Sequence, residues 1–213
     1  MRAIMDAYPD RFVPFEFAKK PNGFWKGRQG QENALEAIKW FVGKRKLTLE
    51  DCARITAEDF RQAELSGMLQ CQFNDSPYLA LKTQFPQLKP WDLIRTPQGY
   101  YNSRENQLTS LLAYLEEKGF PPILEYSPEE IYELGLRLVV TKDDMCDLGF
   151  RGLLRPFGNS MYRTFTELLP GKILPWTLTS LKEPWRDNPK HTAGMAIRWL
   201  FEKYLMILMD EQS

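Results

Sequence analysis

The sequence predicts an all-α fold made of tandem repeats of about 80 residues, each with three short helices joined by extended links that contain Pro and Trp. Three observations carry this prediction. Almost no stretch alternates apolar and polar residues with the period of two that marks a half-buried strand. Apolar residues recur at helical spacing instead. The chain also matches itself, because residues 55–69 align without a gap with residues 140–154, at an offset of 85.

Each repeat opens with a Pro-x-Gly-aromatic-aromatic turn, at residues 21–25 and again at 97–101. The first helix follows this turn, because apolar side chains recur there every three or four residues. The residues of this stripe are Ala34, Ile38, Trp40 and Phe41 in the first copy and Leu108, Leu111, Leu112 and Leu115 in the second.

The second helix begins at Thr56 in one copy and at Thr141 in the other. Each threonine is followed three residues later by an aspartate, which is typical of an N-terminal capping box with Asp in place of Glu. Extended, Gly-containing stretches are predicted next, over residues 65–75 and 150–159.

A third helix is predicted to begin at Ser76, with Pro77 at its first position, and at Ser160 in the second copy. It ends at Pro86 or Pro170, because proline cannot continue a helix. A Trp-containing extended link then leads into the next repeat.

These matches divide the chain into the tail of one repeat (1–21), two full repeats (22–97 and 98–183) and a C-terminal helical half-unit (184–213). The half-unit begins at Pro184-Trp185, and its apolar helical pattern from Met195 to Leu208 echoes the first helix of the other copies. Because terminal repeats need caps, we expect uncovered apolar edges at both ends of the chain.

The second half of each repeat resembles the helix-extended-loop-helix modules of many DNA-associated proteins. The whole repeat also looks like uncharacterised helical repeat modules of bacterial and phage-associated proteins, a likeness that implies no activity. The residues that carry the first resemblance are Ile55, Phe60, Leu65, Gly67, Leu69, Ser76 and Leu81, with Val140, Met145, Phe150, Gly152, Leu154, Ser160 and Phe165 in the second copy.

Composition and motifs exclude several classes of protein. Basic and acidic residues balance at 28 each, which argues against a uniformly basic nucleic-acid coat, and 43% hydrophobic residues argue against a disordered chain. The chain has three cysteines without a C-x-x-C pair and a single histidine, His191. These counts argue against a structural zinc site and against a His-based catalytic triad. No apolar run is long enough to span a bilayer. We therefore expect a soluble, cytoplasmic protein without membrane partners.

No catalytic motif stands out, so we expect a protein that is not an enzyme and has no cofactor or metal. The carboxylate pairs Glu58-Asp59 and Asp143-Asp144 occupy matching positions at helix starts, where the helix dipole favours negative charge. A metal-dependent nuclease is the alternative interpretation of these pairs.

Charge is segregated along the chain. Residues 19–46 carry eight basic and two acidic side chains, residues 101–150 carry four basic and ten acidic, and the residues from 151 onward carry nine basic and six acidic. Basic residues interleaved with aromatics favour phosphate contacts and base stacking. The candidate nucleic-acid-binding residues are Lys19, Lys20, Trp25, Lys26, Arg28, Lys44, Arg45, Lys46, Arg151, Arg155 and Arg163.

The leading hypothesis is therefore a non-enzymatic nucleic-acid-binding repeat protein, with DNA favoured over RNA. The alternative is a protein-interaction module or inhibitor, of phage or mobile-element origin, that acts through its acidic and aromatic surface. The sequence leaves the oligomeric state open.

Overall fold

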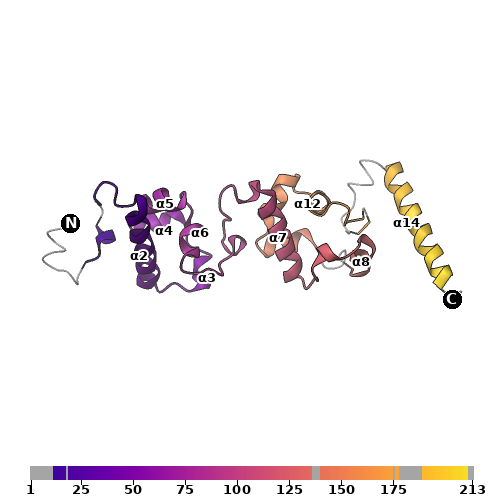
Figure 1. The fold of residues 1–213 in the computed structure, drawn as a ribbon, viewed down its shortest axis with the longest axis horizontal. Coiled ribbons are helices and arrows are strands. Elements are labelled where there is room, and N and C mark those ends of the chain that lie inside the picture. Colours follow the sequence, from indigo (N-terminus) through magenta and orange to yellow (C-terminus); the bar gives the residue numbers. More distant parts are fainter. Residues whose placement is uncertain (1–11, 18, 136–139, 175, 178–188, 211–213) are drawn as a thin grey trace. The chain divides into compact units, whose positions relative to one another are not determined.

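A computed structural model describes residues 12–17, 19–135, 140–174, 176–177 and 189–210. All regular structure within these ranges is helical (Figure 1), so the predicted all-α class is confirmed for them. The chain divides into two compact units, unit 1 (Met1–Tyr100) and unit 2 (Tyr101–Ser213). Within the described ranges, every helix is too short or too polar to pass through a lipid bilayer.

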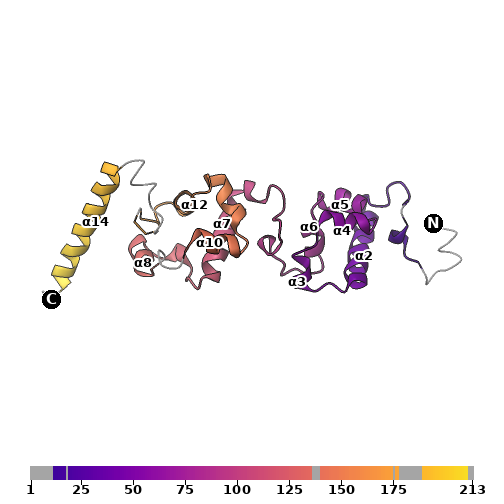
Figure 2. The same ribbon diagram turned by 180° about the vertical axis from the view of Figure 1, so that it is seen from behind.

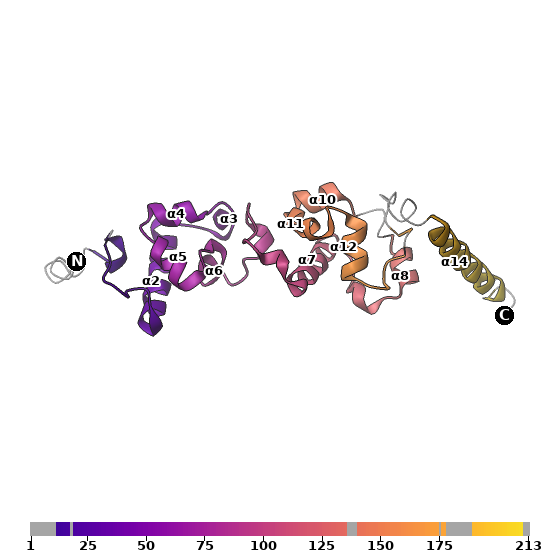
Figure 3. The same cartoon turned by 90° about the horizontal axis from the view of Figure 1, so that it is seen from above.

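Unit 1 is built around the long helix α2, which the stripe of Ala34, Ile38 and Phe41 predicts. These side chains are at most 1% exposed, and the ring of Phe41 stacks on Phe60 at a centroid distance of 4.5 Å. Helix α5 contacts α2, α4 and α6, and Figures 1 and 3 show this group together. Its elements are η1 (Pro14–Glu16), α2 (Gly27–Arg45), α3 (Leu49–Cys52), α4 (Ala57–Gln62), α5 (Ser66–Phe73), α6 (Pro77–Lys82) and η2 (Pro90–Asp92).

Unit 2 has α7 as its central helix, and α11 and α12 both contact it. The view from behind in Figure 2 shows α7, α10 and α12 grouped together. Tyr114 of α7 and Phe150 are fully buried and meet edge to face at 5.5 Å. Its elements, with the turn η3 at the boundary, are η3 (Tyr100–Asn102), α7 (Arg104–Glu117), η4 (Ile123–Glu125), α8 (Pro128–Glu133), α10 (Lys142–Asp147), α11 (Arg151–Leu154), η5 (Arg155–Phe157), α12 (Met161–Leu168) and α14 (Pro189–Asp210).

The predicted helix starts are confirmed. The carboxylate of Asp59 accepts from the Thr56 backbone N–H at 2.9 Å and from its hydroxyl at 2.8 Å, which is the reciprocal half of a capping box. Ser76 and Ser160 each accept a backbone N–H three residues on, at 3.3 and 3.1 Å. The Pro77 ring occupies the first helical position.

The prediction of extended stretches over 65–75 and 150–159 is wrong, because α5, α11 and η5 occupy them. We interpreted Gly67 and Gly152 as signs of irregular backbone, but both lie inside helices. Leu65, Met68 and Leu69 are buried at helical spacing, so the apolar pattern prevails over the low helix propensity of glycine.

Besides α5 and α11, the short helices α3 and α8 were not predicted, and each lies between the first two predicted helices of its unit. Helix α3 begins after the capping residue Thr48, and α8 begins after Ser127. The links also differ from the prediction, because Pro14–Glu16 and Pro90–Asp92 form single 3-10 turns. The Pro184-Trp185 link lies outside the described residues.

In both units, several helices are followed by residues in left-handed backbone. Left-handed backbone is found at Lys46, Glu64, Asn74 and Asp75 in unit 1 and at Gly119, Gly149, Gly158 and Asn159 in unit 2. Two backbone hydrogen bonds of unit 1 also have a counterpart in unit 2. The N–H of Leu65 donates to Phe60 O at 2.8 Å, as the N–H of Phe150 does to Met145 O at 2.7 Å. The N–H of Phe85 donates to Leu81 O at 2.9 Å, as the N–H of Leu169 does to Phe165 O at 2.8 Å.

Candidate nucleic-acid interface

An aromatic ring packs on a helical glycine in unit 1. Trp25 is 7% exposed, and a Cβ added to Gly67 would lie 3.2 Å from its ring. The Trp25 carbonyl accepts a hydrogen bond from Gln72 of α5 at 2.5 Å. Trp25 therefore belongs to the core, and the prediction that it stacks on a base is wrong because its ring is buried.

Unit 2 contains the corresponding contact. A Cβ added to Gly152 of α11 would lie 2.5 Å from the ring of Tyr101, which is 9% exposed. The Tyr101 carbonyl accepts from the buried Gln107 side chain at 2.6 Å. This pairing was not predicted, although the aromatics recur in the sequence at an offset of 76 and the glycines at an offset of 85.

Exposed cations lie beside the aromatic–glycine contact of unit 1. Lys26 follows Trp25 directly and is exposed, as are Lys19 and Arg28. Arg28 pairs with Glu32 at 3.4 Å, but its side chain is 93% exposed. A surface pair of this kind contributes about 0–1 kcal/mol, so an incoming phosphate can replace it.

Lys20, another predicted phosphate-binding residue, makes a contact within unit 1 instead. Its ammonium donates to the backbone carbonyl of Glu64, and burial lowers the pKa of Lys20 while the Glu64 charge opposes that shift. This side chain fastens the segment before α2 to the start of α5, so it is less available to a phosphate.

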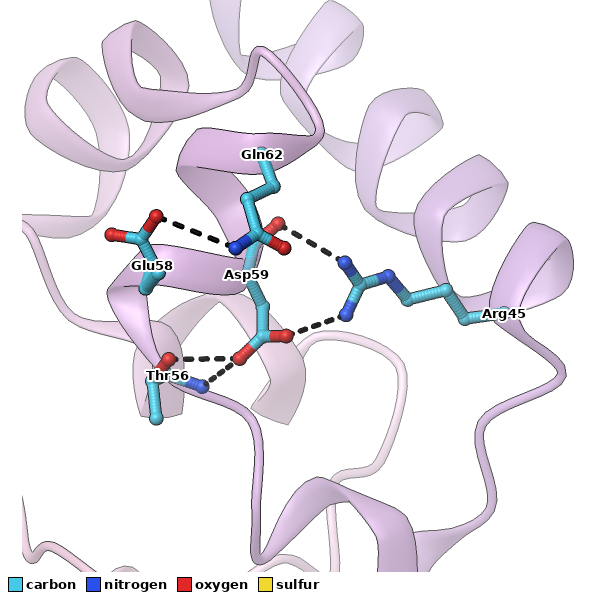
Figure 4. A network of polar contacts seen from close by, with 5 residues as sticks. All are labelled: Arg45, Thr56, Glu58, Asp59 and Gln62. Carbon is cyan, nitrogen blue, oxygen red and sulfur yellow. Dashed lines mark hydrogen bonds and ion pairs between the residues drawn. The ribbon is translucent and has the colours of Figure 1, made fainter.

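The basic run at the C-terminal end of α2 is engaged in the fold. Lys44 contacts Glu16 at 3.3 Å and lies over the ring of Trp40 at 4.5 Å. The guanidinium of Arg45 donates to Asp59 at 2.7 Å (Figure 4). Lys46, in left-handed backbone at the end of the helix, is exposed and has no ion-pair partner among the described residues.

These basic groups do not form one patch. Lys26 and Lys46 stand at opposite ends of the 19-residue helix α2. That length corresponds to roughly 27 Å along the axis. The contiguous basic segment of the sequence is thus divided into a group before and at the start of α2, in which Lys19, Lys26 and Arg28 are exposed, and a largely paired group at its end.

Three arginines of unit 2 come from adjoining elements. Arg151 begins α11 and Arg155 begins η5, and both are exposed. Arg155 is four positions after Arg151 along continuous helical backbone, so their side chains are neighbours. Arg163 is exposed on α12, which contacts both α11 and η5. Arg151 also adjoins Gly152, the residue on which Tyr101 packs.

The second acid of each carboxylate pair, Asp59 or Asp144, caps a helix. Asp144 accepts from the Thr141 hydroxyl at 2.8 Å and from Lys118 at 3.2 Å, and these contacts lower the pKa of Asp144. In the parts of the chain that the structure describes, no group of three or more His, Cys, Asp or Glu side chains is placed to hold a metal ion. His191 lies in the first turn of α14 and is exposed.

No family model, curated protein or solved structure matches this chain. Any functional conclusion therefore depends on its own residues and geometry.

Proposed function

We propose that this chain is a non-enzymatic nucleic-acid-binding protein of tandem helical repeats that contacts the phosphates of DNA. One observation carries the proposal: exposed cations stand beside the same aromatic–glycine contact in both units, Lys26 next to Trp25 and Arg151 next to Gly152. The two cations are not at aligned positions, because Lys26 aligns with Asn102 and Arg151 aligns with Ser66, but each puts a positive charge where a phosphate can approach.

The repeat itself is part of the proposal, and local geometry supports it. Lys118–Asp144 in unit 2 corresponds to Arg45–Asp59 in unit 1, since each pair joins the end of the first helix to the capping aspartate of the second. The aligned left-handed residues and hydrogen bonds described above agree with it. The offset is 73 at the first helix and 85 at the second, so unit 2 has an insertion between them, where α8 lies.

The proposed contact set is narrower than the sequence suggests. Trp25 is excluded because it is buried, and Lys20, Lys44 and Arg45 are excluded because they hold elements of unit 1 together. Contacts between cations and phosphates position a protein on DNA without reading its bases, so the affinity should depend on salt concentration more than on DNA sequence. The remaining residues are Lys19, Lys26, Arg28, Lys46, Arg151, Arg155 and Arg163.

The test is fluorescence anisotropy with labelled duplex DNA, single-stranded DNA and RNA over a range of salt concentrations. Each phosphate contact on B-DNA contributes about −0.9 to the slope of log K against log salt. Arg151→Ala/Arg155→Ala should reduce the magnitude of the slope by about 2. The matched control is Lys142→Ala, an exposed cation at the start of α10. No complex with any of the three nucleic acids at low salt contradicts the proposal.

A second candidate function is binding to a basic protein surface through unit 2. Nine of the ten acidic residues between 101 and 150 are exposed, all except Asp144. Glu116 and Glu117 stand together at the end of α7. A partner that survives nuclease treatment in a pull-down, and is lost with Glu116→Lys/Glu117→Lys, favours this function over nucleic-acid binding.

A further inference from the structure

Helix α14 contacts the rest of unit 2 through a cluster of aromatic rings around one ammonium group. Trp199 meets Tyr132 of α8 edge to face at 5.0 Å, and its ring lies 5.5 Å from that of Trp176. The ammonium of Lys203 lies 5.2 Å from the centre of the Trp199 ring and 5.6 Å from that of Tyr132. It also pairs with the carboxylate of Glu133. We call these five residues the α14 clasp.

Only a narrow face of α14 is covered. Among the described side chains of this helix, those that are not exposed are Thr192, Ala193, Ala196, Trp199 and Lys203. Their spacing places them within roughly 120° around the helix axis. Of this set only Thr192, in the first turn, is buried. The helix is therefore fixed at its first turn and, two turns further on, at the clasp.

Unit 1 has the same set of groups on α2. Residues 37–40 and residues 196–199 share the order Ala, Ile, a basic residue and Trp. The dipeptide Phe15-Glu16 supplies a ring that lies 5.4 Å from the ring of Trp40 and a carboxylate oxygen that lies 3.3 Å from the ammonium of Lys44. That ammonium lies over the Trp40 ring at 4.5 Å.

The two helices differ in what else holds them. The residues of α2 that are buried in the core of unit 1 are Gly30, Ala34, Ala37, Ile38 and Phe41. The counterpart of Ile38 in α14 is Ile197, which is 54% exposed. Loss of the charge of Lys44 therefore leaves α2 packed in its core, whereas α14 depends much more on its clasp.

The packed position of α14 also has a cost. The indole N–H groups of Trp176 and Trp199 and the hydroxyl of Thr177 are buried and make no hydrogen bond to any described residue. A buried donor without an acceptor has lost its hydrogen bonds to water, and this cost is similar in size to the contribution of one cation–π contact. If α14 moves away from α8, the two indole rings separate and Trp199 can donate to water. The net advantage of the packed position is therefore small.

We propose that α14 is a strap, hinged at its first turn, that opens away from α8 when the charge of Lys203 is neutralised. The ammonium is attracted by two rings and by one carboxylate, so a neutral side chain loses all three attractions at once. The cost of the unpaired indole groups remains. Opening uncovers Tyr132 and Trp199, so the strap controls access to an aromatic surface of unit 2. This inference is independent of nucleic-acid binding.

The test is the rate at which the Trp199 indole N–H exchanges with water in the full chain, measured by NMR after ¹⁵N labelling. The chain has six tryptophans, and the signal that Trp199→Phe removes is the one to follow. Lys203→Gln should raise this rate by roughly tenfold, because it removes two cation–π contacts and an ion pair. Lys203→Arg keeps the charge and should leave the rate unchanged. Lys190→Gln is the matched control, since Lys190 is an exposed lysine in the first turn of the same helix.

Two variants outside α14 sharpen the test. Glu133→Gln removes the carboxylate from α8 without altering α14, and it should raise the exchange rate of Trp199 by about threefold. This variant tests the clasp even if Lys203→Gln does not fold. Lys44→Gln should leave the indole signal of Trp40 unchanged, because the core of unit 1 holds α2 in place.

Four results overturn the proposal. The first is an unchanged rate at Trp199 in Lys203→Gln, with the other indole signals showing that the chain is folded. The second is an unchanged rate in Glu133→Gln. The third is an equal increase in Lys190→Gln, which would show that any lost charge on the helix has this effect. The fourth is a Trp199 indole that already exchanges in the unaltered chain as fast as an exposed one.

Discussion

Arg45, at the end of α2, donates to the carboxylate of Asp59 at 2.7 Å, and the same carboxylate caps α4 through Thr56. Burial works against the charged carboxylate, but the hydrogen bonds from Arg45 and Thr56 outweigh it, so the pKa of Asp59 lies below its ordinary value (Figure 4). One side chain thus joins two helices whose sequences are separated by α3.

We expect Asp59→Asn to lower the free energy of unfolding by about 1–2 kcal/mol at pH 7, because it removes the ion pair and weakens the cap. A depressed folded pKa means that the stabilisation is present above the unfolded pKa of about 3.9 and is lost as the pH falls through the folded pKa. Urea unfolding at pH 7 and at pH 3 measures this. The difference between the two proteins should shrink at acidic pH, and an equal difference at both values contradicts the assignment.

Asp143→Asn is the matched control for that experiment. Asp143 stands in the first turn of α10, beside the capping Asp144, and is exposed. The substitution Asp143→Asn should change the free energy of unfolding by less than about 0.5 kcal/mol.

The glycines under the aromatic rings should respond to a methyl group in a defined order. Gly152→Ala places a Cβ 2.5 Å from the Tyr101 ring, whereas Gly67→Ala places one 3.2 Å from Trp25. We expect a loss of about 1–3 kcal/mol for Gly152→Ala and a smaller loss for Gly67→Ala. Thermal unfolding ranks the two, and the reverse order argues against the close packing at Gly152.

Gly43→Ala supplies the control, because Gly43 lies in α2 with nothing within 4 Å of the added Cβ. There the methyl group should stabilise the chain by up to about 1 kcal/mol through helix propensity. Combining Tyr101→Ala with Gly152→Ala should remove most of the specific penalty for the added methyl group.

Tyr114 should limit stability in alkali. Burial, and then the charge of Asp144, raises the pKa of Tyr114 to about 12. A raised folded pKa contributes stability that is present below the unfolded pKa of about 10 and lost as the pH rises through the folded value. Tyr114→Phe should therefore unfold at higher pH than the unaltered chain, as circular dichroism during a titration from pH 9 to 12 would show. Earlier unfolding of the variant contradicts this.

The three cysteines should react at different rates with a thiol reagent. Cys52 is buried, and burial followed by the charge of Asp51 raises the pKa of its thiol to about 11. Cys71 is exposed and Cys146 is half-buried. Because the thiolate is the reactive form, Cys71 should react first and Cys52 only on unfolding. Mass spectrometry of peptides after brief labelling identifies the order, with Cys71→Ser as the control.

Local sequence determined much of the secondary structure. The stripe of Ala34, Ile38 and Phe41 specifies α2, and the Thr56 and Ser76 caps place the starts of α4 and α6, because these features act between residues three or four apart. Short helices such as α5 were missed, because Gly67 reads locally as a helix breaker. Only its contact with Trp25 shows why a glycine is there.

The match of the sequence with itself predicts which residues of the two units are equivalent, but it does not show which cations are exposed and unpaired. Lys26 and Arg45 look alike in a basic run, yet one is exposed beside Trp25 and the other is paired to Asp59. The availability of a charge depends on neighbours distant in sequence. The same holds for Ile38 and Ile197, which share a sequence pattern and differ in burial because a helical core face is completed only by the segments that pack on it.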